Sequence, residues 1–115
     1  MQQISTISEE VLQRRPTHPG EILREDILPE MSMTQQQLAD VLRLSRQQVH
    51  AILSGNSPVT SVTALKLGAL FGNSPEFWTN LQSAYDLWQA REKVDIEVLQ
   101  ELNTLHQWYG ETKGV

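Results

Sequence analysis

Polar side chains concentrate in one short stretch of the sequence, LSRQQVHAILSG, at residues 44–55. On a helix, Arg46, Gln47 and His50 would occupy adjacent positions of one surface. An arginine can donate two hydrogen bonds to O6 and N7 of guanine, and a glutamine can pair with N6 and N7 of adenine. These residue types favour base recognition in the DNA major groove over the alternative, in which they form only the solvated side of an amphipathic helix.

Two helix starts lie close together around this stretch. Thr34 and Gln37 form a predicted capping box, in which the hydroxyl and the glutamine side chain each bond a backbone N–H of the first turn. Ser45 and Gln48 repeat the pattern, and Gly55 is suited to end the second helix. Two short helices joined by a tight turn predict a helix-turn-helix. The first helix carries the apolar residues Leu38, Ala39, Val41 and Leu42, and the second is expected to have Val49, Ile52 and Leu53 facing inward.

The rest of the pattern is helical, without strand or hairpin signals, so the predicted fold class is all-α. We expect an N-terminal arm (1–17) with a short helix, a DNA-binding domain with a dimerisation helix (18–93), and a C-terminal amphipathic helix (94–115). Capping residues and glycine or proline stops predict helices at 19–28, 60–71, 74–92 and 95–109, with Pro29 and Gly110 as two of the stops. Phe77 and Trp78 are expected in the core.

Composition excludes several functional classes. The chain has 115 residues, 39% of them apolar, which suits one compact domain. It lacks an apolar run of roughly 18 residues and a leader-like start, so we expect a cytoplasmic protein without membrane association. There are no cysteines, and His18, His50 and His106 are widely separated. No metal, cofactor or enzymatic activity is therefore expected.

The net charge of −5 at first argues against nucleic acid as a partner. The charges are unevenly distributed, however. Residues 1–73 carry six basic and seven acidic side chains, whereas residues 74–115 carry three and seven. Segment 34–66 holds Arg43, Arg46 and Lys66 against the single acid Asp40. The acidity therefore lies mainly in the last third of the chain, where we expect contacts with something other than DNA.

TQQQLADVLRLSRQQVHAILSG (34–55) resembles the helix-turn-helix of the phage-repressor-like, or Xre, family. HPGEIL (18–23) and NSPEFWTNLQSAYDLW (73–88) resemble the HigA antitoxins of bacterial toxin–antitoxin pairs. This resemblance covers roughly residues 18–90. It implies a lambda-repressor-like bundle, here with an extended C-terminal helical region, that represses its own operon and neutralises a basic RNase-type toxin. Arg43 is a departure, since the family commonly has glycine at this turn position, which takes a positive φ.

The resemblance also implies DNA-contacting residues outside the second helix. Gln35 matches the family's phosphate-contacting glutamine at a helix N-terminus. Ser45 could cap its helix, touch phosphate, or do both. Asn56 and Thr60 flank the following loop and could reach neighbouring phosphates. The predicted set is Gln35, Ser45, Arg46, Gln47, His50, Asn56 and Thr60.

A single helix-turn-helix contacts only a few base pairs, so a homodimer is expected. Leu81, Tyr85 and Trp88 could form its seam. The toxin could bind either the acidic N-terminal arm and following helix or the acidic C-terminal region. We favour the former because Leu99, Leu102 and Leu105 are expected to pack on their own domain. Two alternatives stay open: a stand-alone transcriptional regulator without a toxin, and a helical protein-interaction module that does not bind DNA.

Overall fold

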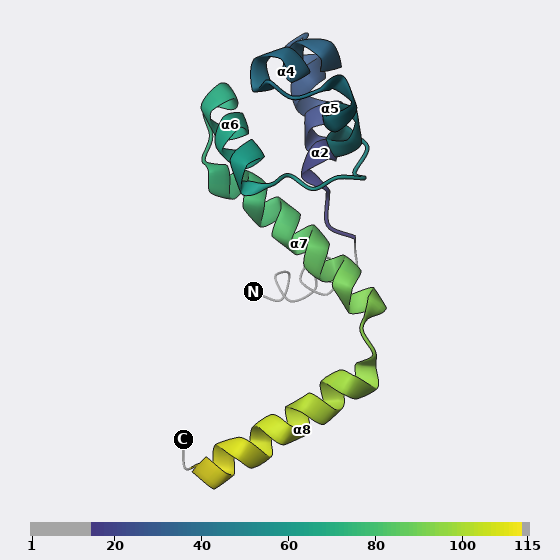
Figure 1. The fold of residues 1–115 in the computed structure, drawn as a ribbon, viewed down its shortest axis with the longest axis vertical. Coiled ribbons are helices and arrows are strands. Elements are labelled where there is room, and N and C mark those ends of the chain that lie inside the picture. Colours follow the sequence, from purple (N-terminus) through teal and green to yellow (C-terminus); the bar gives the residue numbers. More distant parts are fainter. Residues whose placement is uncertain (1–14, 114–115) are drawn as a thin grey trace, which may run out of the picture.

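The computed structural model describes residues 15–113, which contain helices and no strand, as predicted. Figure 1 shows α2, α4, α5 and α6 gathered around the start of α7, with α8 extending away from them. No helix in this range is long and apolar enough to cross a membrane. Residues 1–14, most of the predicted arm and its helix, lie outside the described part. The elements are α2 (Pro19–Ile22), the π-helical turn η1 (Leu23–Ile27), α3 (Leu28–Glu30), α4 (Gln35–Leu42), α5 (Arg46–Leu53), α6 (Ser61–Phe71), α7 (Pro75–Lys93) and α8 (Ile96–Lys113).

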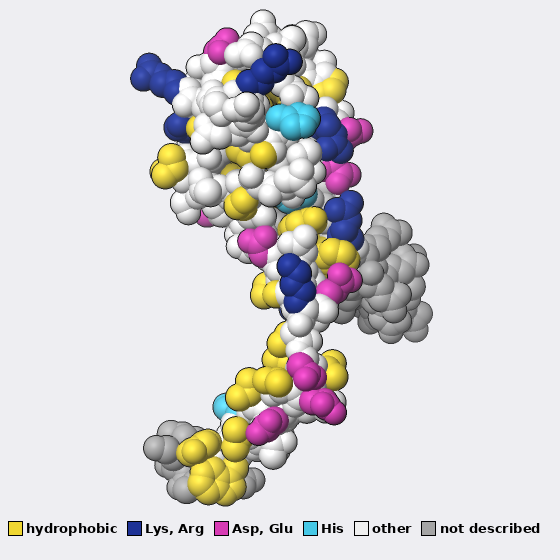
Figure 2. Space-filling model, turned by 45° about the vertical axis from the view of Figure 1, so that its right-hand side comes forward, with side chains coloured by type: hydrophobic (Ala, Val, Ile, Leu, Met, Phe, Trp, Pro, Cys, Tyr) yellow, Lys and Arg dark blue, Asp and Glu magenta, His cyan; other side chains and the backbone are white. Residues whose placement is uncertain are grey.

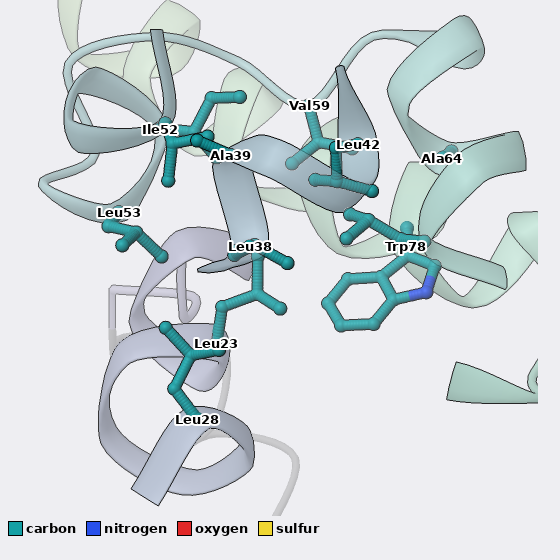
Figure 3. Close-up of a cluster of buried hydrophobic side chains, with 12 residues drawn as sticks. Leu23, Leu28, Leu38, Ala39, Leu42, Ile52, Leu53, Val59, Ala64 and Trp78 are labelled. Carbon is teal, nitrogen blue, oxygen red and sulfur yellow. The ribbon is translucent and has the colours of Figure 1, made fainter. Parts of the chain in front are cut away.

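One apolar core joins the helices from α2 to α7. Figure 3 shows leucines of η1, α3, α4 and α5 in one cluster, with Leu38 near its middle and the Trp78 indole at one side. Trp78 is fully buried, as expected, and its Nε1 donates a hydrogen bond to Oδ1 of Asn73 at 2.9 Å. One core prediction was wrong: Phe77 is 41% exposed, because its neighbour Trp78 occupies the inward position. Val41 of α4 is 54% exposed, since Leu42 occupies the inward position there.

The predicted stop at Pro29 was also wrong. Segments α2, η1 and α3 follow one another without a break, and the helix continues to Glu30. The backbone N–H of Leu28 donates to the carbonyl of Leu23, five residues back, in the wide turn before the proline. A proline ring clashes with the carbonyl four residues back in a regular α-helix, and a π turn relieves that crowding. The chain instead leaves the helix at Ser32, whose φ is 53°.

The C-terminal helix differs most from the prediction. It runs to Lys113, and Gly110 lies inside it. A glycine ends a helix effectively when its φ is positive, as at Gly55 and Gly72, which terminate α5 and α6. The expected packing of the apolar stripe on its own domain was wrong as well. Leu99, Leu102 and Leu105 are exposed by 45%, 55% and 42% because α8 projects from the core (Figure 1).

The start of α2 lies against the end of α5. His18 is the buried N-cap of α2, and its Nδ1 accepts a hydrogen bond from the backbone N–H of Gly20 at 2.9 Å. Burial lowers the pKa of His18, so at neutral pH the ring is uncharged and Nδ1 is free to accept. A Cβ added to Gly20 would lie 1.8 Å from the carbonyl oxygen of Ile52. The two backbones therefore approach as closely as they do because residue 20 has no side chain.

We predict that Gly20→Ala destabilises the protein by about 1–3 kcal/mol or more, because α2 and α5 must separate to admit the methyl group. Urea denaturation followed by circular dichroism measures the change. Gly110→Ala is the matched control, since a Cβ there meets nothing within 4 Å and alanine favours a helix. An unchanged urea midpoint for Gly20→Ala would contradict the close approach.

Candidate nucleic-acid interface

Local hydrogen bonds set the geometry of the helix-turn-helix. Both predicted capping boxes are present: Oγ1 of Thr34 accepts from Gln37 N at 3.1 Å, and Oγ of Ser45 accepts from Gln48 N at 3.0 Å. The glutamine side chains accept the reciprocal bonds from Thr34 N and Ser45 N at 2.9 and 2.8 Å. Arg43 ends α4 with φ 58° and ψ 43°. The turn thus has the predicted left-handed residue, at a cost of order 1 kcal/mol for a non-glycine.

The buried face of α5 determines which of its side chains point outward. Val49, Ile52 and Leu53 lie in the core. The side chains of Arg46, Gln47 and His50 are exposed and make no hydrogen bond or ion pair with any residue of the described range. Arg46 and Gln47 are the first two residues of α5, and His50 follows one turn later. All three candidate base-contacting groups are therefore free to bind a ligand.

The other candidates occupy three separate places. Gln35 is the first residue of α4 and is partly exposed. Thr60 caps α6, accepting from Thr63 N at 3.3 Å, and lines a groove together with Gln48 of α5. Asn56 lies beyond the far end of α5, where it lines a pocket with Tyr85. The hydroxyl oxygens of Ser45 and Thr60 accept the capping hydrogen bonds of their helices, and both residues remain exposed.

Two cations outside the helix-turn-helix, Arg24 and Lys66, bind the C-terminal ends of its two helices. Nη1 of Arg24 donates to the carbonyl oxygen of Leu53, at the C-terminal end of α5, at 2.6 Å. Nζ of Lys66 donates to the carbonyl oxygen of Leu42, at the C-terminal end of α4, at 2.8 Å. A cation at this end of a helix opposes the negative end of its dipole. The partners lie 29 and 24 residues apart, so no local pattern could have identified them.

The α7 helix contacts the loop after α5 and the N-cap of α2. Oε1 of Gln82 accepts from the buried backbone N–H of Val59 at 2.8 Å. The Tyr85 and His18 rings meet edge to face, with their centroids 4.9 Å apart. Trp88 lies one turn further along, its ring 6.2 Å from that of Tyr85. One side of α7 carries Leu81, Tyr85 and Trp88, which are all partly buried. Because its ring contacts His18, Tyr85 has a structural role within the protomer in addition to the predicted role at a dimer seam.

Comparison with known proteins agrees with this geometry. The helix-turn-helix family model matches residues 23–78. The chain is 39% identical over 84 residues to antitoxin HigA-1 of Vibrio cholerae, covering 73% of this chain and 79% of that protein. It is similar to an addiction module antidote protein of the HigA family from Coxiella burnetii, with 44% identity, a TM-score of 0.70, and coverage of 76% and 96%. It is also similar to Pseudomonas aeruginosa antitoxin HigA, solved with the higBA promoter, at 39% identity, a TM-score of 0.66, and coverage of 69% and 86%.

We predict different effects for the two classes of contact. Arg46→Ala should weaken binding to the specific DNA site by about 1–3 kcal/mol and relax the preference at one base position. Gln35→Ala should weaken binding to all sequences alike, because it removes a phosphate contact. Fluorescence anisotropy with the specific duplex and single-base variants measures both, and affinity should fall steeply with salt.

Gln100→Ala is the control for both variants, since Gln100 is exposed on α8, away from the helix-turn-helix. An Arg46→Ala protein that keeps full discrimination between the duplexes, or binding that does not respond to salt, would contradict base recognition by α5.

Proposed function

The chain belongs to the helix-turn-helix family that includes the HigA antitoxins, and we propose that it is a DNA-binding antitoxin that represses its own operon and neutralises a small basic RNase-type toxin. The observation that carries this proposal is the free polar edge of α5, Arg46, Gln47 and His50, on a helix whose opposite face is buried. The relative from P. aeruginosa, whose structure includes promoter DNA, supports the same role for this chain. The protein acts by binding rather than by catalysis, in the cytoplasm where operator DNA is found.

On DNA, α5 enters the major groove with its N-terminal end toward the base pairs. Arg46 and Gln47 contact base edges, and His50 adds a third contact one turn along the helix. Gln35, Ser45 and Thr60 position the protein on the phosphates next to that groove, and Asn56 contacts the backbone from the other end of α5. Arg43 and Arg46 are the exposed cations of segment 34–66, since Lys66 is engaged by the carbonyl of Leu42. They supply the positive charge that attracts the duplex.

Two copies of the chain bind together through α7. Next to its Leu81, Tyr85 and Trp88 side, the hydrogen bond of Gln82 to Val59 joins α7 to the loop after α5, and the ring contact of Tyr85 with His18 joins it to the cap of α2. A seam here sets the separation of two recognition helices, which must match half-sites about one DNA turn apart.

We predict that Trp88→Ala weakens the dimer at least about tenfold, because an aromatic anchor at the centre of an interface contributes strongly. Sedimentation equilibrium measures the dissociation constant. Leu87→Ala is the matched control, an exposed apolar residue on another side of the same helix. A Trp88→Ala protein with the dimer affinity of the unmutated chain would contradict this seam.

The antitoxin role predicts that a small basic protein is encoded next to this chain, and co-expression with that neighbour tests the role. Expression of that neighbour alone should arrest growth, and co-expression with the full chain should restore it. Arg46→Ala should restore growth equally well while losing repression of a reporter under the operon's promoter, because the residue serves DNA and not the toxin. A neighbour that does not arrest growth would leave a stand-alone regulator. An unmutated chain that restores growth and does not bind the operator would leave an interaction module.

A further inference from the structure

The α8 helix carries an apolar stripe that no other part of the described chain covers. Val98, Leu102, Leu105 and Tyr109 follow one another at spacings of four, three and four residues, which places them on one side of a helix. Each is between 42% and 55% exposed. Figure 2 shows yellow side chains running along α8, bordered by magenta ones. This stripe is too regular for scattered surface residues and is typical of a helix that binds in a groove.

The charges beside the N-terminal half of the stripe are acidic. Asp95, Glu97 and Glu101 lie near the start of α8, and the sequence from 94 to 112 contains no lysine or arginine. On the face drawn in Figure 2, the dark-blue basic side chains lie on the globular part and α7. An acidic rim around an apolar centre is complementary to a basic partner and would repel nucleic acid.

We propose that α8 is the docking helix for the basic toxin, an inference that rests on the function proposed above. The stripe inserts into an apolar groove of the toxin, and Asp95, Glu97 and Glu101 pair with the cations at its rim. The helix lies beyond α7, away from α5 (Figure 1), so a toxin held there leaves the DNA-contacting residues free. The repressor can therefore bind operator and toxin at the same time.

A second copy of α8 is a poorer occupant of the stripe. The four positions span only about two heptads, and coiled coils that associate unaided generally sustain at least three or four. A stable interface also buries about 1,200–2,000 Å² in total, more than one short stripe offers to its own copy. A groove in a globular partner surrounds the helix and covers more of each side chain.

The test uses two variants of the full chain that each add two negative charges to α8. Leu102→Glu with Leu105→Glu disrupts the stripe, and Gln100→Glu with Asn103→Glu places the charges on the polar side. Isothermal titration against the purified basic neighbour measures toxin affinity, anisotropy measures operator affinity, and sedimentation measures oligomeric state. We expect the stripe variant to bind the toxin at least tenfold more weakly, with operator affinity unchanged. The polar-side variant should bind both as the unmutated chain does.

The contribution of the acidic rim (Asp95, Glu97 and Glu101) can be measured separately, through the rate of association with the toxin. Glu97→Gln with Glu101→Gln should slow association with the toxin and reduce its dependence on salt, since surface charges act mainly on the association rate.

Three results would overturn the proposal, and they are distinguishable. A stripe variant with unchanged toxin affinity excludes α8 as the docking helix and leaves the antitoxin function intact. An unmutated chain that does not bind the basic neighbour refutes the antitoxin function itself, and the α8 proposal with it. A stripe variant that loses self-association and binds the toxin normally assigns the stripe to a second copy of the chain.

Discussion

The packing of α5 against α2 holds the side chains proposed to contact DNA in an outward position. Gly20 lets the backbone of α2 approach the carbonyl of Ile52, and Arg24 donates to the next carbonyl, that of Leu53. Val49, Ile52 and Leu53 of α5 are buried in the common core. Because the inner face of α5 cannot rotate away from the core, Arg46 and Gln47 must point outward. The recognition edge is thus a consequence of close backbone packing on the opposite side of the helix.

Charge separates the two ends of the molecule. The helix-turn-helix keeps its few cations near α5, and two further cations, Arg24 and Lys66, stabilise the C-terminal ends of α5 and α4. The acids of α8 lie on a helix outside the core, where they do not oppose the approach of DNA. A chain with a net charge of −5 can therefore present a surface suited to phosphates at one end and one suited to a basic protein at the other.

The α7 helix connects the proposed DNA-binding part with the proposed toxin-binding helix. Near its start, Trp78 is part of the core, and Gln82 and Tyr85 bind the loop after α5 and the cap of α2. Its C-terminal half extends beyond the globular part and leads to α8 (Figure 1). A dimer formed along α7 would fix the distance between two recognition helices, because the same helix is bonded to the elements that hold α5.

The sequence by itself determined the local geometry of this protein. The spacing of Val49, Ile52 and Leu53 indicated which side of α5 would face the core, and the family resemblance indicated the left-handed turn at Arg43. The caps at Thr34 and Ser45 follow from hydrogen bonds within three residues, which a sequence pattern records directly. Most helix boundaries follow for the same reason, and Pro29 was misjudged because its preceding turn widened to accept it.

Only the tertiary structure decided which apolar faces have a partner inside the chain. Periodicity shows that a helix has an apolar side, and it says nothing about what covers that side. Trp78 and Leu38 are buried by other helices, whereas Val41, Phe77 and the Leu99, Leu102 and Leu105 positions are exposed despite equally regular spacing. The sequence could not predict the cation contacts at the ends of α4 and α5 for a related reason, because the partners lie 24 and 29 residues apart. Contacts at that separation depend on how the whole chain packs, which no short stretch of sequence specifies.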